Sequence, residues 1–458
     1  MLKEKNEEGR FVVQKKRVDM LYGSITKSML QMILPLMVIN IISSLFKLID
    51  MSILGKLTND NAVGAVGVCN AIISLCTGTL IGISAGANVL VARCIGEENQ
   101  EKTEKAVGTA IMVSLILGIL VLVFGVSFAE VFLRWIDCPE SIFDKAAVYF
   151  RIYFIGMPAI SLYNFAAAIL RAFGDTKRPM VFLIIGAVIK IVLDIVLITA
   201  FNMTAEGVAI ATASANIVAA GLTLGVLFSE KDKIHISLKI LKIRSEEVKQ
   251  ILFIGVPAGL HFAFSAFSNV VMSSAVNGLG VNAVTGVSVA NRFDEILYQI
   301  SNAPSLASMA FVAQNIGAKN FKRAEKAVLI AVIIAVIVGL FPGILFALFS
   351  KQLSGLITNT PAVIEYSCQR LILVSLTYFL CGINDVFGEA LRGMGKPIAP
   401  TVATFLFLCL LRFVWVYGFF PRFLHLTFLY LVWPVGWAGS ITTLFIIYFY
   451  SMKNIRKG

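Results

Sequence analysis

The sequence predicts an all-α membrane protein with twelve transmembrane helices in two six-helix lobes related by an internal repeat. The chain of 458 residues is 58% hydrophobic and 14% charged, with a mean hydropathy of +0.85. A soluble protein carries about 25% charged residues. Here the charges lie in short clusters between apolar stretches of roughly 20 residues, the length that spans a bilayer as a helix. Three motifs also occur twice, which indicates two similar halves.

The repeat has one constant offset. The segment 86–99 (GANVLVARCIGEEN) returns as 307–320 (ASMAFVAQNIGAKN), EKAV at 104–107 returns at 325–328, and LRAFG at 170–174 returns as LRGMG at 391–395. The differences 317 − 96, 325 − 104 and 392 − 171 all equal 221. In an apolar chain, such a repeat is typical of secondary transporters.

Each half contains six apolar runs, which we interpret as spans. In the first half they cover 28–54, 62–92, 106–128, 147–170, 179–200 and 207–228; in the second half they cover 248–275, 284–314, 327–349, 364–391, 398–420 and 429–450. The runs are continuous rather than alternating, which excludes a transmembrane β-barrel. We therefore expect lobes at 28–229 and 248–450, a tail at 1–27, a basic linker at 230–247 and a second tail at 451–458.

Basic residues collect on every second connection. The two tails and the linker are rich in Lys and Arg, whereas the alternate connections hold few, among them Lys56 and Arg134. Because Lys and Arg accumulate on the cytoplasmic side, both termini and the linker are expected in the cytoplasm of a multi-pass inner (plasma) membrane protein. The first 27 residues lack the apolar core of a signal peptide. An even number of spans per half predicts repeats related by an axis along the membrane normal.

Several function classes lack support in the sequence. The net charge of +12 comes from residues at helix ends rather than from one basic face, which argues against nucleic-acid binding. The seven cysteines are odd in number and show no metal or disulfide spacing. No HExxH, P-loop, GxSxG or kinase signature is present. We therefore expect no enzyme, no ATP-driven pump, no catalytic residues, no metal site and no cofactor.

Two aspartates stand inside apolar spans of the first half. Asp50 follows Lys47 by three residues, and Asp194 follows Lys190 by four, so each pair shares one helix face. An intramembrane carboxylate costs at least about 2.5–3.5 kcal/mol at the midplane, so it is usually paired and functional. The equivalent positions of the second half are Val271 and Trp415, a difference that favours a coupling site over repeated structural pairs. The plainer alternatives are ion pairs that only neutralise a packed bundle, or a solvated Asp50 at the interface.

At these residues the chain resembles the multidrug and toxic compound extrusion (MATE) family. The resemblance covers about residues 28–450 and rests on motifs in spans 1, 5 and 6 and after spans 4 and 10: Leu48–Ile49–Asp50–Met51 with Gly55, Val192–Leu193–Asp194, segment 207–212, segment 170–179 and segment 391–397. It implies two lobes around a central cavity and export of organic compounds driven by sodium or proton entry. It further implies a cation-responsive site at Asp50 and Asp194, with Asn164 and Thr212 nearby.

Lys190 departs from the family pattern, because members often carry Asn at this position. An ammonium group there would compete with sodium for the carboxylates, so we favour H+ over Na+ as the coupling ion. Our hypothesis is that Lys190 forms an ion pair with Asp194 or Asp50 that proton entry breaks. The alternative is that Lys190 extends to the membrane interface.

The second half offers weaker candidates. Span 7 contains His261 but no acid, whereas span 10 contains Asp385 and Glu389, four residues apart on one face. These like charges repel unless one is protonated or paired, and the partners considered are Arg370, Arg292 and Arg412. With Tyr163 of span 4, His261, Asp385 and Glu389 form a candidate substrate or second site.

Three function classes compete. A secondary exporter of small organic compounds, expected to be cationic, would depend on an ion gradient and on the two aspartates. A lipid-linked oligosaccharide flippase of the same superfamily would need a basic cavity open to lipid, for which Lys47, Lys190, Arg292 and Arg412 are available. A membrane enzyme would need a cluster of nucleophile or metal ligands that the sequence does not show. We favour the exporter, working as a monomer in contact with membrane lipid and without nucleic acid.

Overall fold

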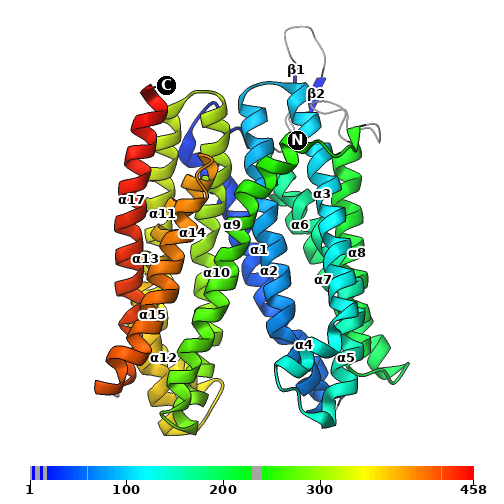
Figure 1. Cartoon of the computed structure of the whole chain (residues 1–458), viewed down its shortest axis with the longest axis vertical. Helices are drawn as coiled ribbons and strands as arrows, with labels where there is room; N and C mark the ends of the chain where they lie inside the picture. Colours follow the sequence, from blue (N-terminus) through cyan, green and yellow to red (C-terminus); the bar gives the residue numbers. More distant parts are fainter. Residues whose placement is uncertain are drawn as a thin grey trace.

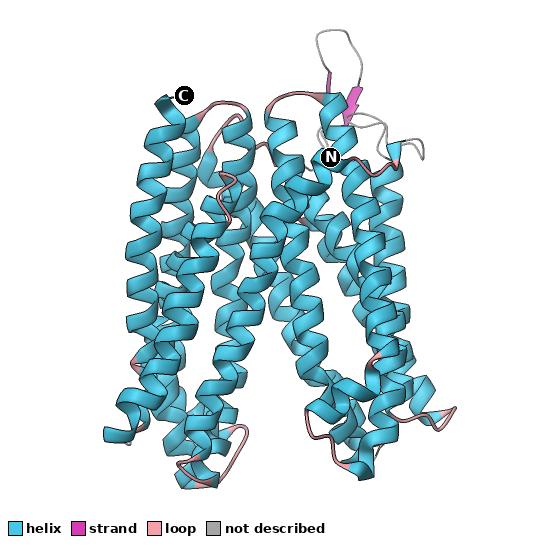
Figure 2. Cartoon of the chain, viewed as in Figure 1, coloured by secondary structure: helices cyan, strands magenta, loops and turns pink. Residues whose placement is uncertain are grey.

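The computed structural model describes residues 3–5, 11–13, 18–58, 60–229, 240–423 and 425–457. Nearly all of the described chain is helical (Figures 1 and 2). The side chains of Lys47, Leu48, Met51 and Asp60 lie outside the description, as do residues 1–2, 6–10 and 14–17 of the expected tail and 230–239 of the expected linker. Two short strands, β1 (Lys3–Lys5) and β2 (Phe11–Val13), pair antiparallel ahead of the first helix.

The described residues of the first half form eight helices. They are α1 (Ile25–Leu57), α2 (Asp60–Gly96), α3 (Gln100–Ser127), α4 (Ala129–Trp135), α5 (Glu140–Ile155), α6 (Met157–Ala172), α7 (Lys177–Thr199) and α8 (Ala205–Ser229). Polar residues define several of the starts: the side chains of Ser24 and Asn99 accept hydrogen bonds from the backbone N–H groups of Lys27 and Lys102, which caps α1 and α3.

The second half repeats this order. It contains α9 (Ser245–Asn277), α10 (Val281–Gly317), α11 (Phe321–Leu348), α12 (Ser350–Gly355) and α13 (Pro361–Gly393). One further span is built from α14 (Ile398–Ala403), the π-helix η2 (Thr404–Leu410), α15 (Leu411–Val414), the π-helix η3 (Trp415–Phe419) and the 3-10 helix η4 (Phe420–Arg422). The last span comprises α16 (Leu426–Tyr430) and α17 (Val432–Lys457).

The structure confirms the repeat at the level of whole helices. Helices α2 and α10 have 37 residues each, and α3 and α11 have 28 each. Their first residues, 60 and 281 for one pair and 100 and 321 for the other, differ by the predicted 221. The halves differ at the fourth span, where α5 and α6 meet at a bend of 42°. Pro158 in the first turn of α6 explains this break, because proline has no N–H to continue the hydrogen bonds of α5 and its ring clashes with the carbonyl of the preceding turn. Its equivalent in the continuous α13 is Phe379.

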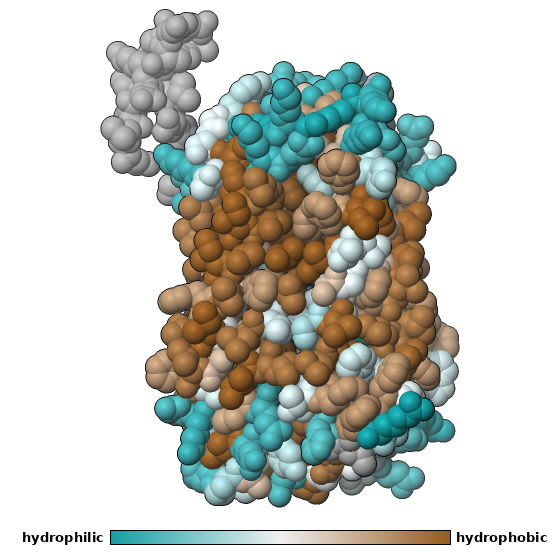
Figure 3. Space-filling model, turned by 90° about the vertical axis from the view of Figure 1, so that its left-hand side faces the viewer, coloured by the Kyte–Doolittle hydropathy of each residue, from teal (hydrophilic) through white to brown (hydrophobic). Residues whose placement is uncertain are grey.

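The described helices fit the expected membrane topology. Ten of them are long and apolar enough to cross a membrane, or up to 11 if the bent pair α5–α6 counts as one span. Helix α10, at the place of the eighth expected span, is not among these ten, because polar residues such as Arg292, Asp294 and Glu295 interrupt its apolar sequence. Figure 3 shows a broad apolar band between two hydrophilic ends on one face of the molecule.

The two halves meet along α2 and α9 and diverge toward the end opposite the termini (Figure 1). Glycines allow this close crossing: a Cβ added at Gly82 would lie 2.4 Å from the backbone nitrogen of Gly259, and one added at Gly86 would lie 2.1 Å from the carbonyl oxygen of Ile251. The Asn40 side chain of α1 also donates to the carbonyl of Gln299 on α10 at 2.8 Å. These contacts join the two halves around the cavity that both of them line.

Candidate functional site

Three of the predicted residues come together in the first half. The Nζ atom of Lys190 lies 2.8 Å from Oδ2 of Asp50 and 2.7 Å from Oδ2 of Asp194. Lys190 and Asp194 stand one turn apart on α7, whereas Asp50 reaches them from α1, so the lysine joins two helices. The side chain of Asp194 is 1% exposed, and those of Lys190 and Asp50 are 14% and 22% exposed. Lys190 therefore bridges both aspartates and points into the protein rather than to the membrane interface.

The charges of this group do not cancel. Two carboxylates and one ammonium, all ionised, carry a net charge of −1 in a site shielded from water. The Oδ1 atoms of Asp50 and Asp194 are buried and have no hydrogen-bond partner within the described part of the chain. An uncompensated charge in such a place costs several kcal/mol. Binding of one proton, or of another monovalent cation, would neutralise the group.

The other two predicted members of this site make hydrogen bonds within their own helices. The side chains of Asn164 and Thr212 donate to the carbonyls of Ile160 and Val208 on their own helices, at 2.8 Å each. Among the residues described, no hydrogen bond joins either side chain to the two carboxylates or to Lys190. The predicted proximity of Lys47 to Asp50 concerns a side chain outside the description. The site shown by geometry is therefore the triad Asp50, Lys190 and Asp194.

A cavity of about 350 Å³ lies between the two halves. The first half lines it with residues that include Asn40, Tyr163, Asn164 and Arg171, and the second half lines it with His261, Tyr298, Asp385, Glu389 and Arg392. The hydroxyl of Tyr163 donates to the carbonyl of Pro179 at 3.1 Å. All four predicted substrate or second-site residues, Tyr163, His261, Asp385 and Glu389, thus line one cavity that both halves share.

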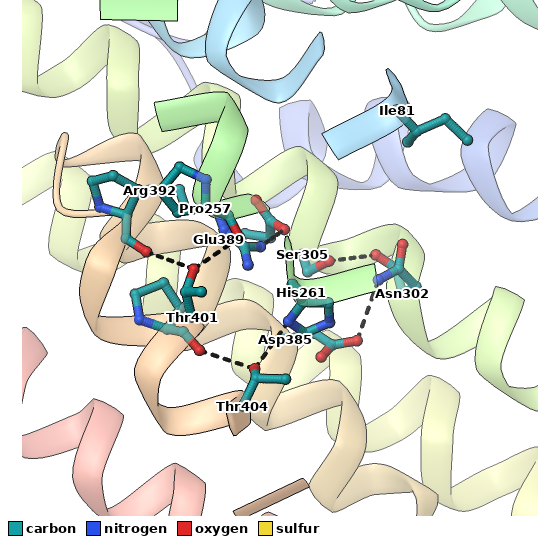
Figure 4. Close-up of polar contacts among 12 residues, drawn as sticks. Ile81, Pro257, His261, Asn302, Ser305, Asp385, Glu389, Arg392, Thr401 and Thr404 are labelled. Atoms are coloured by element: carbon teal, nitrogen blue, oxygen red, sulfur yellow. Dashed lines mark hydrogen bonds and ion pairs between the residues drawn. The ribbon is translucent and has the colours of Figure 1, made fainter. Parts of the chain in front are cut away.

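Figure 4 shows the wall that the second half contributes to this cavity. Asp385 accepts hydrogen bonds from the side-chain amides of Asn302 and Asn384, both at 3.2 Å, and Nδ1 of His261 lies 2.9 Å from Oγ1 of Thr404. Glu389 forms an ion pair with Arg392, three residues later on α13. The predicted partners of Glu389 and Asp385 were therefore wrong: Arg392 pairs with Glu389, and two amides stabilise Asp385. A partner within the next turn of the same helix was the simpler solution.

The sequence also missed an ion pair in the second half. Nε of Arg370 on α13 lies 2.8 Å from Oδ2 of Asp294 on α10, and both side chains are buried. Arg370 was considered only as a partner for span 10 acids. The available signal was the charge of Asp294 inside the expected span 284–314, but nothing in the sequence showed which basic residue on another helix would face it. Arg292 is exposed and does not line the cavity between the two halves.

The described residues contain no candidate metal-binding site. Within them, no group of three or more His, Cys, Asp or Glu side chains is placed to hold a metal ion. Acids in the interior have nitrogen partners instead, among them Lys190, Arg370, Arg392 and the amides of Asn302 and Asn384.

Comparison with known proteins agrees with this architecture. A probable multidrug resistance protein of Bacillus subtilis, YoeA, is 28% identical over 387 residues, which cover 83% of this chain and 83% of that protein. An FAD transporter of Shewanella oneidensis is 26% identical, covering 85% of this chain and 86% of that protein. A crystal structure of MATE in complex with MaL6 superposes with a TM-score of 0.90 at 21% identity, covering 97% of this chain and 100% of that one.

The family model matches each repeat separately. The MatE model covers residues 35–196 and 257–417, one copy in each half and well over half of the chain. The matched segments contain Asp50, Lys190 and Asp194 in the first half and Asp294, Arg370 and Asp385 in the second. The chain belongs to the MatE family of multidrug and toxic compound extrusion transporters.

Proposed function

We propose that the protein is a secondary active exporter of organic cations, in which proton entry drives efflux through the Asp50–Lys190–Asp194 triad. The observation that carries this proposal is the single ammonium group of Lys190 within 2.8 Å of two carboxylates on two different helices. A pair of acids sharing one base has a free position for one cation, which is what a coupling site requires. Relatives named as multidrug resistance proteins support export of organic compounds.

The proposed coupling step is a change of partners. When a proton binds Asp50, that carboxylate becomes neutral and loses most of its attraction for Lys190, which stays paired with Asp194 on its own helix. The contact between α1 and α7 is then weakened, because the ion pair between Lys190 and Asp50 joins these two helices. Helix α1 also contacts the second half through Asn40. A shift of α1 would therefore be transmitted to the interface between the halves.

Lys190 favours H+ over Na+ as the coupling ion. Its ammonium group already occupies the position between the two carboxylates that a sodium ion would take. A proton needs no such space, because it binds one oxygen, and the Oδ1 atoms of both aspartates are without partners in the described structure. Sodium entry would first require Lys190 to leave.

The cavity shared by the halves is the proposed substrate site. It places carboxylates at Asp385 and Glu389 opposite the ring of Tyr163, and Phe262 and Tyr298 add further aromatic surface. Carboxylates and aromatic faces are the groups that attract organic cations. Because both halves line the cavity, movement of one half against the other changes its access, as alternating access requires. We further propose that the protein acts as a monomer in the inner (plasma) membrane, with both termini in the cytoplasm.

Gradient-driven uptake into inside-out proteoliposomes tests the proposal. With an acidic lumen, the wild-type protein should accumulate the fluorescent cation ethidium, and a sodium gradient of the same size should drive less uptake. Asp50→Asn and Asp194→Asn should each lower the proton-driven rate by about tenfold or more, since an intramembrane coupling acid is not replaced by an amide.

The matched control is Glu130→Gln, which makes the same carboxyl-to-amide change in an exposed ion pair with Arg151. It should keep the wild-type rate. Wild-type uptake that is independent of both gradients would refute the exporter. Movement of a lipid-linked oligosaccharide without any gradient would favour the flippase instead.

A further inference from the structure

A second cavity, of about 500 Å³, lies within the second half. Helices α9, α10, α13, α15 and α17 surround it, and its lining combines charged groups with aromatic rings, among them Asp294, Arg370, Tyr378, Arg412, Trp433 and Trp437. It shares His261, Phe262, Tyr298, Asn384 and Asp385 with the cavity between the halves, so the two spaces adjoin.

The first arginine of this cavity is neutralised within the protein. Arg370 pairs with Asp294 at 2.8 Å, and its guanidinium carbon lies 5.0 Å and 4.9 Å from the ring centres of Tyr430 and Trp433. Buried charges in proteins are normally paired in this way. This ion pair therefore adds no net charge to the cavity.

The second arginine has no such partner. Arg412 is 7% exposed, and its Nη1 donates only to neutral groups, Oγ of Ser268 at 3.1 Å and Oδ1 of Asn269 at 3.4 Å. Its Nε is buried without a hydrogen-bond partner in the described structure. Among the described residues, no ion pair joins Arg412 to a carboxylate. A guanidinium cannot lose its charge by deprotonation under physiological conditions, so its missing counter-ion must come from elsewhere.

The two acids at the border of the cavity do not fill this role. Asp385 receives hydrogen bonds from Asn302 and Asn384, and Glu295 lies on an exposed face of α10. The guanidinium groups of Arg370 and Arg412 lie 4.9 Å and 4.6 Å from the ring centre of Trp433, so two like charges that repel each other share one aromatic ring. An anion entering the cavity would relieve this repulsion.

The aromatic rings around Arg412 favour an anion that carries a planar aromatic ring. The guanidinium carbon of Arg412 lies 4.6 Å from the ring centre of Trp433, and the rings of Tyr378 and Trp437 lie 5.5 Å apart in the same cavity. Arginine holds carboxylate and phosphate groups through two parallel hydrogen bonds, and the side chains of Tyr378 and Trp437 add aromatic surface to the same cavity. The site combines one fixed cation with an aromatic wall.

This cavity and the proposed proton site occupy equivalent places in the two repeats. Arg412 and Arg370 occupy the positions equivalent to Ile191 and Tyr149, 221 residues earlier. Ile191 adjoins Lys190 on α7, and Tyr149 of α5 lies near Asp50 and Asp194. The first half thus holds two acids and one base at this level, and the second half holds two bases and one acid.

We propose that Arg412, Tyr378 and Trp437 form a binding site for planar aromatic anions, with the carboxylate or phosphate on Arg412 and the ring against the two aromatic side chains. This site goes beyond the proposed export of organic cations, because it adds a ligand class of opposite charge. Equilibrium binding tests it without any ion gradient, so a failure of the proposed coupling mechanism would not affect the result.

The experiment measures fluorescence anisotropy of fluorescein with the purified full-length protein, corrected for empty micelles. Rhodamine 123, which has the same xanthene rings and a positive charge, is the comparison dye. Fluorescein should bind saturably, and Arg412→Gln should weaken its binding by about tenfold or more, as expected for a lost hydrogen bond to a charged group. The affinity for rhodamine 123 should change by less than about twofold, because that dye carries no group for Arg412.

Arg292→Gln is the matched control, since it removes an exposed arginine outside the cavity and should leave fluorescein binding unchanged. If Arg412→Gln does not fold, competition in the wild-type protein decides: 2-naphthoate should displace fluorescein, and 2-naphthalenemethanol should not. Equal displacement by both compounds, absence of saturable binding, or normal binding to a folded Arg412→Gln variant would overturn the proposal. Displacement by short-chain phosphatidylglycerol but not by 2-naphthoate would assign the site to a lipid headgroup and also overturn it.

Discussion

Gly96 and Gly317 hold equivalent positions in the two repeats, and each packs against the helix that carries the other. A Cβ added at Gly96 would lie 2.0 Å from the carbonyl oxygen of Gln314, and one added at Gly317 would lie 2.3 Å from that of Arg93. Arg93 and Gln314 are themselves 221 residues apart, so the contact has two-fold symmetry. It joins the ends of α2 and α10 on the side of the molecule that carries the termini (Figure 1).

This contact predicts that a methyl group added at Gly96 would push α2 and α10 apart at the end of the molecule that carries the termini. Gly96→Ala should lower the thermal midpoint of the purified protein and reduce gradient-driven ethidium uptake, because a Cβ this close to backbone forces the helices apart. Overpacking of this kind costs about 1–3 kcal/mol.

Gly67→Ala is the control for this prediction. It lies on the same helix, and a Cβ added there meets nothing within 4 Å. Alanine stabilises an open helical position by up to about 1 kcal/mol, so this variant should melt at or above the wild-type temperature. Equal behaviour of the two variants would show that the close approach at Gly96 is unimportant.

The ion-pair triad predicts an unusual pattern of stability. Lys190→Met removes the only base and leaves Asp50 and Asp194 as two buried acids, which should destabilise the protein by about 3–5 kcal/mol. The triple variant Lys190→Met, Asp50→Asn, Asp194→Asn has no charge left in the site. It should recover most of the thermal stability but none of the proton-driven uptake.

Thermal melting and ethidium uptake, measured on the same preparations, check this pattern. Lys351→Met, an exposed lysine on α12, controls for the loss of a lysine as such and should melt like the wild type. A triple variant that melts as early as Lys190→Met would show that the charges are not what stabilises the contact between α1 and α7.

The helix order was predictable because it depends on local hydropathy and on a repeat that the sequence displays directly. The break at Gly156 was not predicted, although Pro158 signals it, since the apolar run continues across it. The pairing of Lys190 with Asp194 followed from spacing on one helix, but the approach of Asp50 depends on how α1 packs on α7. The Arg370–Asp294 pair was missed for the same reason, because its two residues lie 76 positions apart in sequence on two different helices.

The hydrogen bonds of residues 18–24, the segment that precedes α1, lead to a prediction about amide hydrogen exchange. The Arg323 side chain on α11 donates to three carbonyls of this segment, those of Met20 at 3.0 Å, Tyr22 at 2.8 Å and Gly23 at 2.9 Å. Val18 donates to the carbonyl of Gly174 at 3.0 Å, so the segment connects both halves. Arg323→Ala should speed amide hydrogen exchange in residues 18–24 by about tenfold or more, since hydrogen bonds from a charged group are worth about 1.5–3 kcal/mol.

Arg456→Ala, which breaks an exposed ion pair with Glu325 near the same end, should leave exchange in residues 18–24 unchanged. If Arg323→Ala also leaves it unchanged, other contacts hold the segment, such as the hydrogen bond from Asn315 to Met20 at 3.1 Å.

The last prediction concerns the choice of coupling ion. Lys190→Asn replaces the ammonium group between Asp50 and Asp194 with a neutral amide, whose oxygen can itself bind a cation. The space between the carboxylates then becomes available to sodium, an ion that prefers oxygen ligands. Ethidium uptake driven by a sodium gradient should therefore rise relative to uptake driven by a proton gradient, and the pH dependence of uptake should change. Lys190→Arg keeps a positive charge in the same place and should retain the preference for protons. If Lys190→Asn shows the cation preference and pH profile of the wild type, Lys190 takes no part in coupling, and its contacts with the two aspartates only hold α1 against α7.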